Sequence, residues 1–102
     1  MPNFLTLMMI ANLIEKEWMW RNFNVVTSDG VFEVAYDGRG IGYEQVKVND
    51  EVACRKPSYI WYVEKFDFMI GRSKAQVRVK VSLLLQISKF SLLVDDTIIY
   101  SE

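Results

Sequence analysis

The sequence predicts an all-β protein: an antiparallel β-sandwich of about eight short strands, preceded by a short apolar segment. From Trp18 onward, β-branched and aromatic residues come in short runs in which polar residues hold alternate positions. Gly, Asp and Asn separate these runs at close spacing, which is typical of antiparallel strands joined by tight turns. The same stretch lacks the periodicity of a helix. These observations together favour two packed sheets over a helical fold.

The first predicted hairpin occupies residues 22–36. Phe23 and Val25 alternate with asparagines, and Ser28-Asp29-Gly30 supplies a turn that tolerates a positive φ. Over residues 32–36, the returning strand carries Phe, Val and Tyr on one face. We expect that face to point into the core, because side chains alternate between the two faces of a strand.

Glycine and asparagine mark the next hairpin. The glycine-rich segment 37–42 is predicted to turn into a strand over residues 43–48, and Asn49-Asp50 into a short strand over residues 51–54. A phosphate-binding loop would need a helix after the glycines, whereas a strand is expected here, so we interpret the segment as a turn. Pro57 has no backbone donor and is expected to end this part of the sheet.

Residues 59–63, Tyr-Ile-Trp-Tyr-Val, form an uninterrupted aromatic and aliphatic run. Because neither face of this run is polar, we interpret it as a strand covered on both faces. Phe66, Phe68 and Ile70 then alternate with charged residues and a methionine, which predicts another strand.

The C-terminal part of the chain shows the clearest alternation. Residues 77–81 place valines on one face and basic residues on the other, as in a strand with one buried and one solvated face. Residues 83–94 are long and apolar, with an expected break near residues 86–88. Asp95-Asp96 is predicted to turn the chain into a last strand over residues 97–100.

The first seventeen residues form a separate apolar segment, and the β-sandwich is predicted to span residues 18–102. Residues 2–14 are almost uncharged, but a stretch of this length is short of the ~20 residues that a membrane-spanning helix needs. No basic residue precedes them and Glu15-Lys16-Glu17 follows, which argues against a signal peptide. Two alternatives stay open: a short helix or strand packed on the domain, or a translation start at Met8 or Met9.

Composition narrows the classes of function. Of 102 residues, 51% are hydrophobic, and 12 basic against 13 acidic residues leave a net charge of −1. This balance argues against nucleic acid or an anionic membrane as the main partner. The chain has no histidine, which removes Ser-His-Asp catalysis and histidine metal sites. We therefore expect a protein that is not an enzyme, with no catalytic residue, no bound metal and no cofactor.

The single cysteine, Cys54, cannot form an intrachain disulfide, which favours a reducing, cytoplasmic location. The neighbouring Arg55 and Lys56 could lower the pKa of its thiol, but no histidine is present to act as a base. We expect a buried, inert thiol.

The turn carboxylates offer a second chemical candidate. Paired acids can hydrolyse glycosides or bind calcium, but their spacing matches no calcium loop, and Asp is a preferred turn residue. The acids concerned are Asp29, Asp37, Asp50, Asp95 and Asp96.

Five aromatic residues are the candidate interaction site: Trp18, Trp20, Tyr59, Trp61 and Tyr62. Exposed aromatic side chains on a β-sandwich can anchor a partner protein or stack against a sugar. Aromatic residues also form strands and fill cores, so core packing or self-association is favoured over ligand stacking.

Basic residues concentrate at Arg72, Lys74, Arg78 and Lys80. A solvated sheet face or edge explains them best, because charged edges also discourage aggregation between sheets. A phosphopeptide or another anionic partner is the alternative.

The order of these features resembles one repeat of the Fas apoptotic inhibitory molecule family over residues 22–100. Five segments carry the resemblance: Phe23-x-Val25 with Ser28-Asp29-Gly30, Gly42-Tyr43-x-x-Val46-x-Val48-Asn49-Asp50, Phe68-x-Ile70-Gly71, Ala75-x-Val77-x-Val79, and Leu92-x-Val94-Asp95-Asp96. The chain departs from the family where Asp50 and Asp96 replace the usual glycine, and in having one repeat instead of two. The resemblance implies an antiparallel β-sandwich that acts in protein interaction, in a family associated with restraint of apoptosis and protection against protein aggregation.

The sequence therefore predicts a protein-interaction module that self-associates, most simply as a homodimer. The apolar runs at residues 59–63 and 83–85 look too rich for the core of one small domain, which motivates the second copy. The alternative is a β-sandwich that binds a carbohydrate or another small ligand through exposed aromatic residues.

Overall fold

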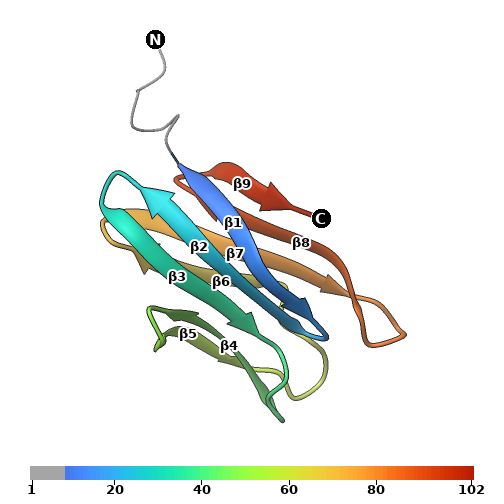
Figure 1. Cartoon of the computed structure of the whole chain (residues 1–102). Helices are drawn as coiled ribbons and strands as arrows, with labels where there is room; N and C mark the ends of the chain where they lie inside the picture. The colour runs from blue at the N-terminus through green and yellow to red at the C-terminus, as the bar shows by residue number, and fades with distance from the viewer. Residues whose placement is uncertain (1–8) are drawn as a thin grey trace.

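The computed structural model describes residues 9–102 and confirms the all-β prediction: two antiparallel sheets lie face to face (Figure 1). The first sheet is a meander in the order β1-β2-β3-β4-β5, and the second is a meander in the order β6-β7-β8-β9. The strands of the first sheet are β1 (Ile10–Glu17), β2 (Trp20–Thr27), β3 (Gly30–Asp37), β4 (Tyr43–Val48) and β5 (Glu51–Pro57). Those of the second are β6 (Lys65–Ile70), β7 (Ser73–Val81), β8 (Ile87–Val94) and β9 (Thr97–Ser101).

Strand β1 lies within the apolar segment that the sequence placed before the domain. It pairs antiparallel with β2, so that Ile10 lies opposite Val26 and Glu17 opposite Trp20. Of the two packed forms that the sequence left open, helix or strand, the structure has a strand, and it forms an edge of the first sheet. Residues 1–8 of the same segment lie outside the described residues.

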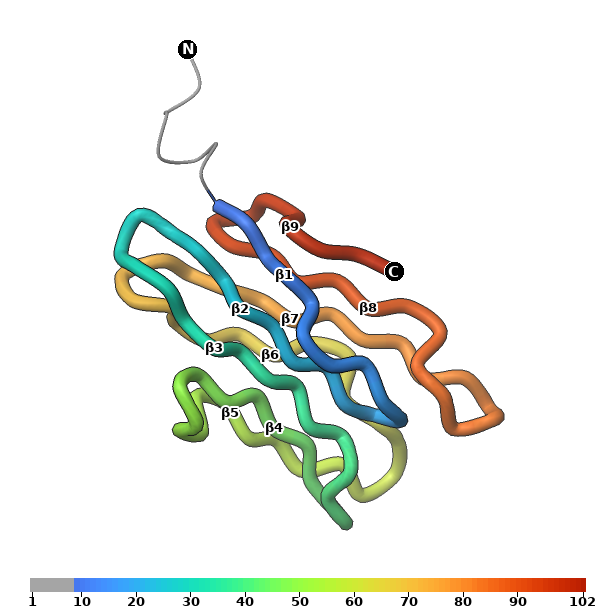
Figure 2. The backbone as a smooth tube through the Cα atoms, viewed as in Figure 1, coloured from blue at the N-terminus to red at the C-terminus, as the bar shows by residue number. Residues whose placement is uncertain are grey.

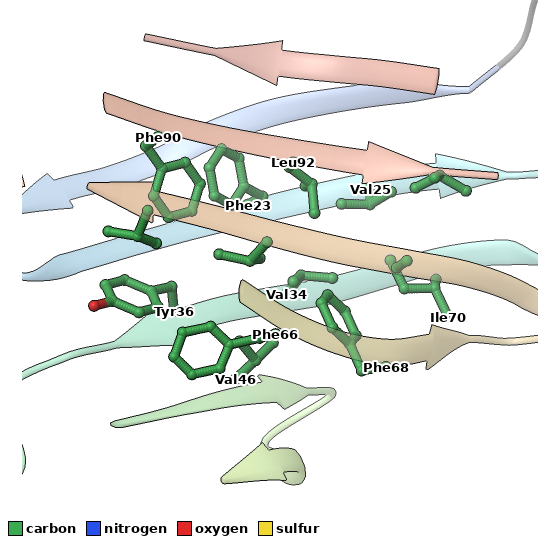
Figure 3. Packing of buried hydrophobic residues seen from close by; sticks show 14 of the residues in the cluster. Phe23, Val25, Val34, Tyr36, Val46, Phe66, Phe68, Ile70, Phe90 and Leu92 are labelled. Carbon is green, nitrogen blue, oxygen red and sulfur yellow. The ribbon is translucent and has the colours of Figure 1, made fainter. Parts of the chain in front are cut away.

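The core fills the space between the two sheets (Figure 3). The alternation predicted for residues 22–36 and 77–81 decides which side chains enter it, since Phe23, Tyr36 and Val77 are all 1% exposed or less. Aromatic rings join the sheets: Phe23 stacks on Phe90 with ring centroids 5.7 Å apart, and Tyr36 meets Phe66 edge-on at 5.7 Å. Such pairs stabilise a core beyond the area they bury.

The turn predictions are confirmed at four hairpins. Positive φ angles occur at Asn49 and Asp50 (51° and 67°) and at Asp95 and Asp96 (48° and 63°), as expected for two-residue turns with a left-handed backbone. Gly30 also has a positive φ, of 127°, at the start of β3. The glycine-rich segment 37–42 connects β3 to β4, as predicted.

Two strand predictions are wrong. Residues 59–63 are not a covered strand; they lie in the loop that carries the chain from β5 in the first sheet to β6 in the second. Residues 83–85 do not begin a strand either, because β7 ends at Val81 and β8 starts at Ile87. Residues 58–64 must carry the chain from one sheet to the other, and residues 82–86 must reverse its direction within the second sheet. Both segments are therefore loops, although their apolar residues are of the kind found in buried strands.

Asp50→Gly is expected to raise the free energy of unfolding by about 0.5–1 kcal/mol, because a left-handed residue other than glycine is strained by its Cβ. The change creates Asn-Gly, the preferred pair for this turn. Asn49→Gly is the matched control: it also removes a Cβ, but it deletes the Oδ1 atom that accepts a 2.9 Å hydrogen bond from the Glu33 amide. Urea unfolding should therefore show a gain for Asp50→Gly only, and an equal gain for both would contradict this explanation.

A partly buried ion pair links β2 of the first sheet to Glu102, the residue after β9. Arg21 on β2 is 5% exposed, and its Nε and Nη2 atoms donate to the two carboxylate oxygens of Glu102 at 3.0 and 2.8 Å. The hydroxyl of Tyr100 donates to the same carboxylate at 2.6 Å. These donors, Arg21 first, hold the pKa of Glu102 at about 2, below its usual 4.5.

This depressed pKa gives a pH-dependent prediction. A carboxyl group whose pKa is lower in the folded than in the unfolded state stabilises the fold above the unfolded pKa, and the benefit is lost as the pH falls toward the folded pKa. Glu102→Gln resembles the protonated acid, so it should reduce the free energy of unfolding at pH 7, by about 1 kcal/mol because solvent screens this exposed residue. The difference from the wild type should shrink between pH 4.5 and about 2 in urea unfolding at a series of pH values. A constant difference over that range would contradict the role of the ionised carboxylate.

Candidate interaction surface

The two meanders bring four connections to one end of the sandwich, which we call the apolar end (Figure 2). They are the β1–β2 turn (residues 18–19) and the loops over residues 38–42, 58–64 and 82–86. Hydrogen bonds join these connections to one another. The Gly38 amide donates to the carbonyl of Met19 at 2.8 Å, and the Ser58 amide donates to the carbonyl of Gly42 at 3.0 Å.

Large apolar side chains are exposed on this end. Its members are Trp18 (54% exposed), Ile41 (97%), Tyr59 (86%), Ile60 (97%), Trp61 (44%), Leu83 (91%), Leu84 (83%) and Leu85 (46%). Two shallow hollows bring part of the set together: one of about 280 Å³ is lined by Ile60, Trp61 and Leu85 among others, and one of about 430 Å³ includes Ile41 and Tyr59.

The opposite end of the sandwich is polar. Its turns are formed by Ser28-Asp29, Asn49-Asp50, Gly71-Arg72 and Asp95-Asp96. There the Asp29 carboxylate accepts hydrogen bonds from the amide and the guanidinium group of Arg72, and these bonds lower its pKa. One end of the domain thus has ordinary turn residues, while the other presents side chains that are normally buried.

The apolar end is held in a defined conformation. The indole Nε1 of Trp18 donates a 2.7 Å hydrogen bond to the carbonyl of Leu85, which fixes the position of the ring against the 82–86 loop. Leu85 itself has a φ of 60°, in the left-handed region that glycine and asparagine adopt at lower energy.

Glu44 on β4 anchors the 58–64 loop from inside the protein. The residue is 0% exposed, and its two carboxylate oxygens accept hydrogen bonds from the Tyr36 hydroxyl and the Val63 amide, both at 2.7 Å. Burial raises the pKa of Glu44, and the hydrogen bonds from Val63, Tyr36 and Ser58 oppose that rise. The Val63 amide therefore has a hydrogen-bond partner although no strand pairs with it.

The structure brings only part of the predicted site together. Trp18, Tyr59 and Trp61 are exposed at the apolar end, whereas Tyr62 is half-buried and packs edge-on against Trp61 with ring centroids 5.4 Å apart. Trp20 is also half-buried, with the guanidinium carbon of Arg39 lying 4.2 Å from its ring centroid.

Ile41, Ile60 and Leu83–Leu85 belong to this surface and were not among the predicted site residues. The sequence indicated that the apolar runs at residues 59–63 and 83–85 exceed what one core can hold; residues 59–61 and 83–85 are exposed, whereas Tyr62 and Val63 pack against the core. Ile41 gave a weaker signal: a single isoleucine between two glycines in a turn.

The two candidates for chemistry, the five turn acids and Cys54, lie in different parts of the fold. The five turn acids lie at or beside turns, as predicted, and within residues 9–102 no three of the Cys, Asp and Glu side chains gather in a way that could hold a metal ion. Cys54 was expected to be buried but is half-buried, because it lies on the edge strand β5, opposite Val46.

The fold and this surface define a class: an antiparallel β-sandwich with an apolar end built from four connected loops. Comparison with models of known protein families, with curated proteins and with solved structures found no match for this chain. Among the described residues there is no helix long and apolar enough to cross a membrane.

Proposed function

We propose that this protein is a non-enzymatic protein-interaction module of the cytoplasm that self-associates through its apolar end. The observation that carries the proposal is the contrast between the two ends of the sandwich, one polar and one rich in exposed Trp, Tyr, Ile and Leu. Surfaces of this kind mark interaction sites, because water disfavours large apolar patches on a free monomer.

The size of the apolar end supports a second copy as the occupant. Five of its side chains, Ile41, Tyr59, Ile60, Leu83 and Leu84, are more than 80% exposed. With roughly 150–200 Å² for each large side chain, the apolar end offers on the order of 800–1,000 Å². That is close to the ~800 Å² per partner that a stable complex buries, and it exceeds the few hundred Å² of the largest apolar patch on a typical monomer.

A symmetric dimer also fits the shape of this end. In a twofold arrangement the same patch meets itself, so each projecting residue of one copy can enter a hollow of the other. The exposed Leu83 and Leu84 directly precede Leu85, which lines a hollow together with Ile60 and Trp61. Trp18, Tyr59 and Trp61 supply the aromatic anchors that are enriched among residues dominating binding energy.

The resemblance to one repeat of the Fas apoptotic inhibitory molecule family supports the same class of function. Both turns in which the chain has Asp in place of the family's glycine, at Asp50 and Asp96, have the positive φ that glycine would favour. The backbone at the two departures is therefore one that glycine also favours.

Light scattering coupled to gel filtration tests the proposal. We expect the weight-average mass to approach that of two chains at tens of micromolar and to fall on dilution toward that of one chain. A mass of one chain throughout the range would contradict self-association.

A second candidate function, binding of a carbohydrate, is favoured by the exposed and fixed indole of Trp18 together with Trp61. Sugars stack on exposed aromatic rings, so binding would change tryptophan fluorescence. A change on titration with one of a panel of mono- and oligosaccharides, in a protein that stays monomeric, would favour this candidate over self-association.

A further inference from the structure

The outer face of the second sheet carries a concentrated basic patch, which consists of Lys65, Arg78, Lys80 and Lys89. These residues come from three neighbouring strands, and the register places Lys65 opposite Arg78 and Lys80 opposite Lys89. All four line one open hollow of about 230 Å³, together with Glu64, Val79 and Ser91. Of the basic residues that the sequence grouped, Arg72 lies elsewhere, paired with Asp29, and Lys74 lies toward the polar end of β7.

The pairing in this patch is unfavourable for the isolated fold. Like charges directly opposite each other on neighbouring strands destabilise a sheet, and here two such pairs stand side by side. None of the four cations takes part in an ion pair within residues 9–102, whereas Lys16, Arg21, Arg39 and Arg72 do. Of the acids on this side, Glu64 lines the same hollow, and Asp67 accepts a hydrogen bond from Gln76, whose Oε1 atom accepts one from Arg78 Nε. The patch is therefore short of negative charge.

The spacing of the patch suits a compact dianion. Adjacent strands lie about 4.8 Å apart and alternate residues about 7 Å apart, so the four strand positions fall within roughly 12 Å. Neighbouring cations of the patch therefore lie within about one Debye length, ~8 Å at physiological salt, so their potentials add. A phosphate monoester carries nearly two negative charges and three strong acceptor oxygens. Arg78 offers planar paired donors, and Ser91, opposite Arg78 on β8, offers a hydroxyl.

A second, mainly apolar hollow lies farther along strands β6 and β7. It has a volume of about 450 Å³ and is lined by Asp67, Phe68, Met69, Lys74 and Ala75, with Met69 50% exposed. Met69 follows Lys65 by four residues on β6, which corresponds to about 13 Å of strand. An extended peptide covers that distance in the same number of residues, so one segment can reach both hollows.

We propose that this face binds a phosphorylated protein segment in an extended conformation. The phosphate group lies over Lys65, Arg78, Lys80 and Lys89, and an apolar side chain four residues away lies over Met69. The face is too small and the whole chain too acidic for a nucleic acid backbone, which requires an extended basic surface. Glu64 lies at the rim of the basic hollow and weakens binding of the phosphate.

Fluorescence anisotropy with a labelled peptide tests the proposal on the full chain. The probe is Leu-Ala-Ala-Ala-phosphoserine-Ala-Ala-Ala-Leu, which presents the apolar residue in either direction, and its comparisons are the unphosphorylated peptide and a phosphorylated peptide with both leucines replaced by alanine. Loss of the charged hydrogen bonds should weaken binding of the unphosphorylated peptide by about tenfold or more. Replacing both leucines should weaken binding of the phosphorylated peptide severalfold.

Three variants assign the site. Arg78→Gln should weaken binding of the phosphorylated probe by about tenfold, and Glu64→Gln should strengthen it severalfold. Lys47→Gln makes the same charge change as Arg78→Gln but on the first sheet, and should leave binding unchanged. Equal weakening by Lys47→Gln and Arg78→Gln, equal binding with and without phosphate, or equal binding of a short RNA at 0.15 M salt would each overturn the proposal. So would inorganic phosphate that competes as well as the peptide does.

Discussion

Glu44→Ala is expected to lower the free energy of unfolding by about 3 kcal/mol. Two buried donors, the Tyr36 hydroxyl and the Val63 amide, would lose their acceptor, and the missing side chain would leave a cavity beside the core. The same change frees the 58–64 loop from the first sheet, so the effect is both global and local. Chemical unfolding monitored by circular dichroism measures the global part.

Glu44→Gln is the matched control for this prediction. It keeps the shape of the side chain and one oxygen acceptor, so its effect should be about half as large or less. It also removes the charge whose burial raises the pKa of Glu44, which offsets part of the lost hydrogen bonding. If Glu44→Ala were as stable as the wild type, the carboxylate would not be the anchor of the loop.

Ile60→Asp and Leu84→Asp are each expected to raise the dissociation constant of the proposed dimer by about thirtyfold or more. Both residues are at least 83% exposed, so neither is needed for the fold of one chain. In the dimer, however, each substitution would bury a carboxylate in an apolar interface, which costs several kcal/mol or forces the two copies apart. Dilution experiments by sedimentation equilibrium measure the change.

Val31→Asp provides the control for these two variants. Val31 is another large apolar residue, 64% exposed, but it lies at the opposite end of β3, away from the apolar end. All three variants should unfold within about 0.5 kcal/mol of the wild type, because exposed positions tolerate substitution. If Val31→Asp weakened association as much as Leu84→Asp, the interface would not be the apolar end.

Alternation of residue types predicted most of the fold, because a period of two determines which face of a strand is buried. Val77 and Val79 enter the core and Arg78 and Lys80 face solvent, as the pattern required. Turn residues were equally informative, because the left-handed backbone at Asn49-Asp50 selects short polar residues or glycine. Strand β1 was harder to predict from the sequence, because its apolar residues do not follow a clear period of two.

The apolar end could not be predicted in the same way. A run such as Tyr59-Ile60-Trp61 satisfies every local criterion of a buried strand, and only the path of the chain between the two sheets places it in an exposed loop. Leu83–Leu85 presents the same difficulty. Hydrophobicity predicts that these side chains are buried, but it does not distinguish the core of one chain from an interface with another. The composition did indicate an excess of apolar residues, but their gathering at one end depends on the meander topology of both sheets.

Nuclear magnetic resonance of the ¹⁵N-labelled chain on dilution tests the central claim most directly. From hundreds to a few micromolar, we expect shifts in the amide signals of residues 58–62 and 83–85 and in the indole signals of Trp18 and Trp61. Signals from the polar turns at Asn49-Asp50 and Asp95-Asp96 should stay in place. Signals that stay unchanged at both ends, or that shift at the polar turns instead, would contradict self-association through the apolar end.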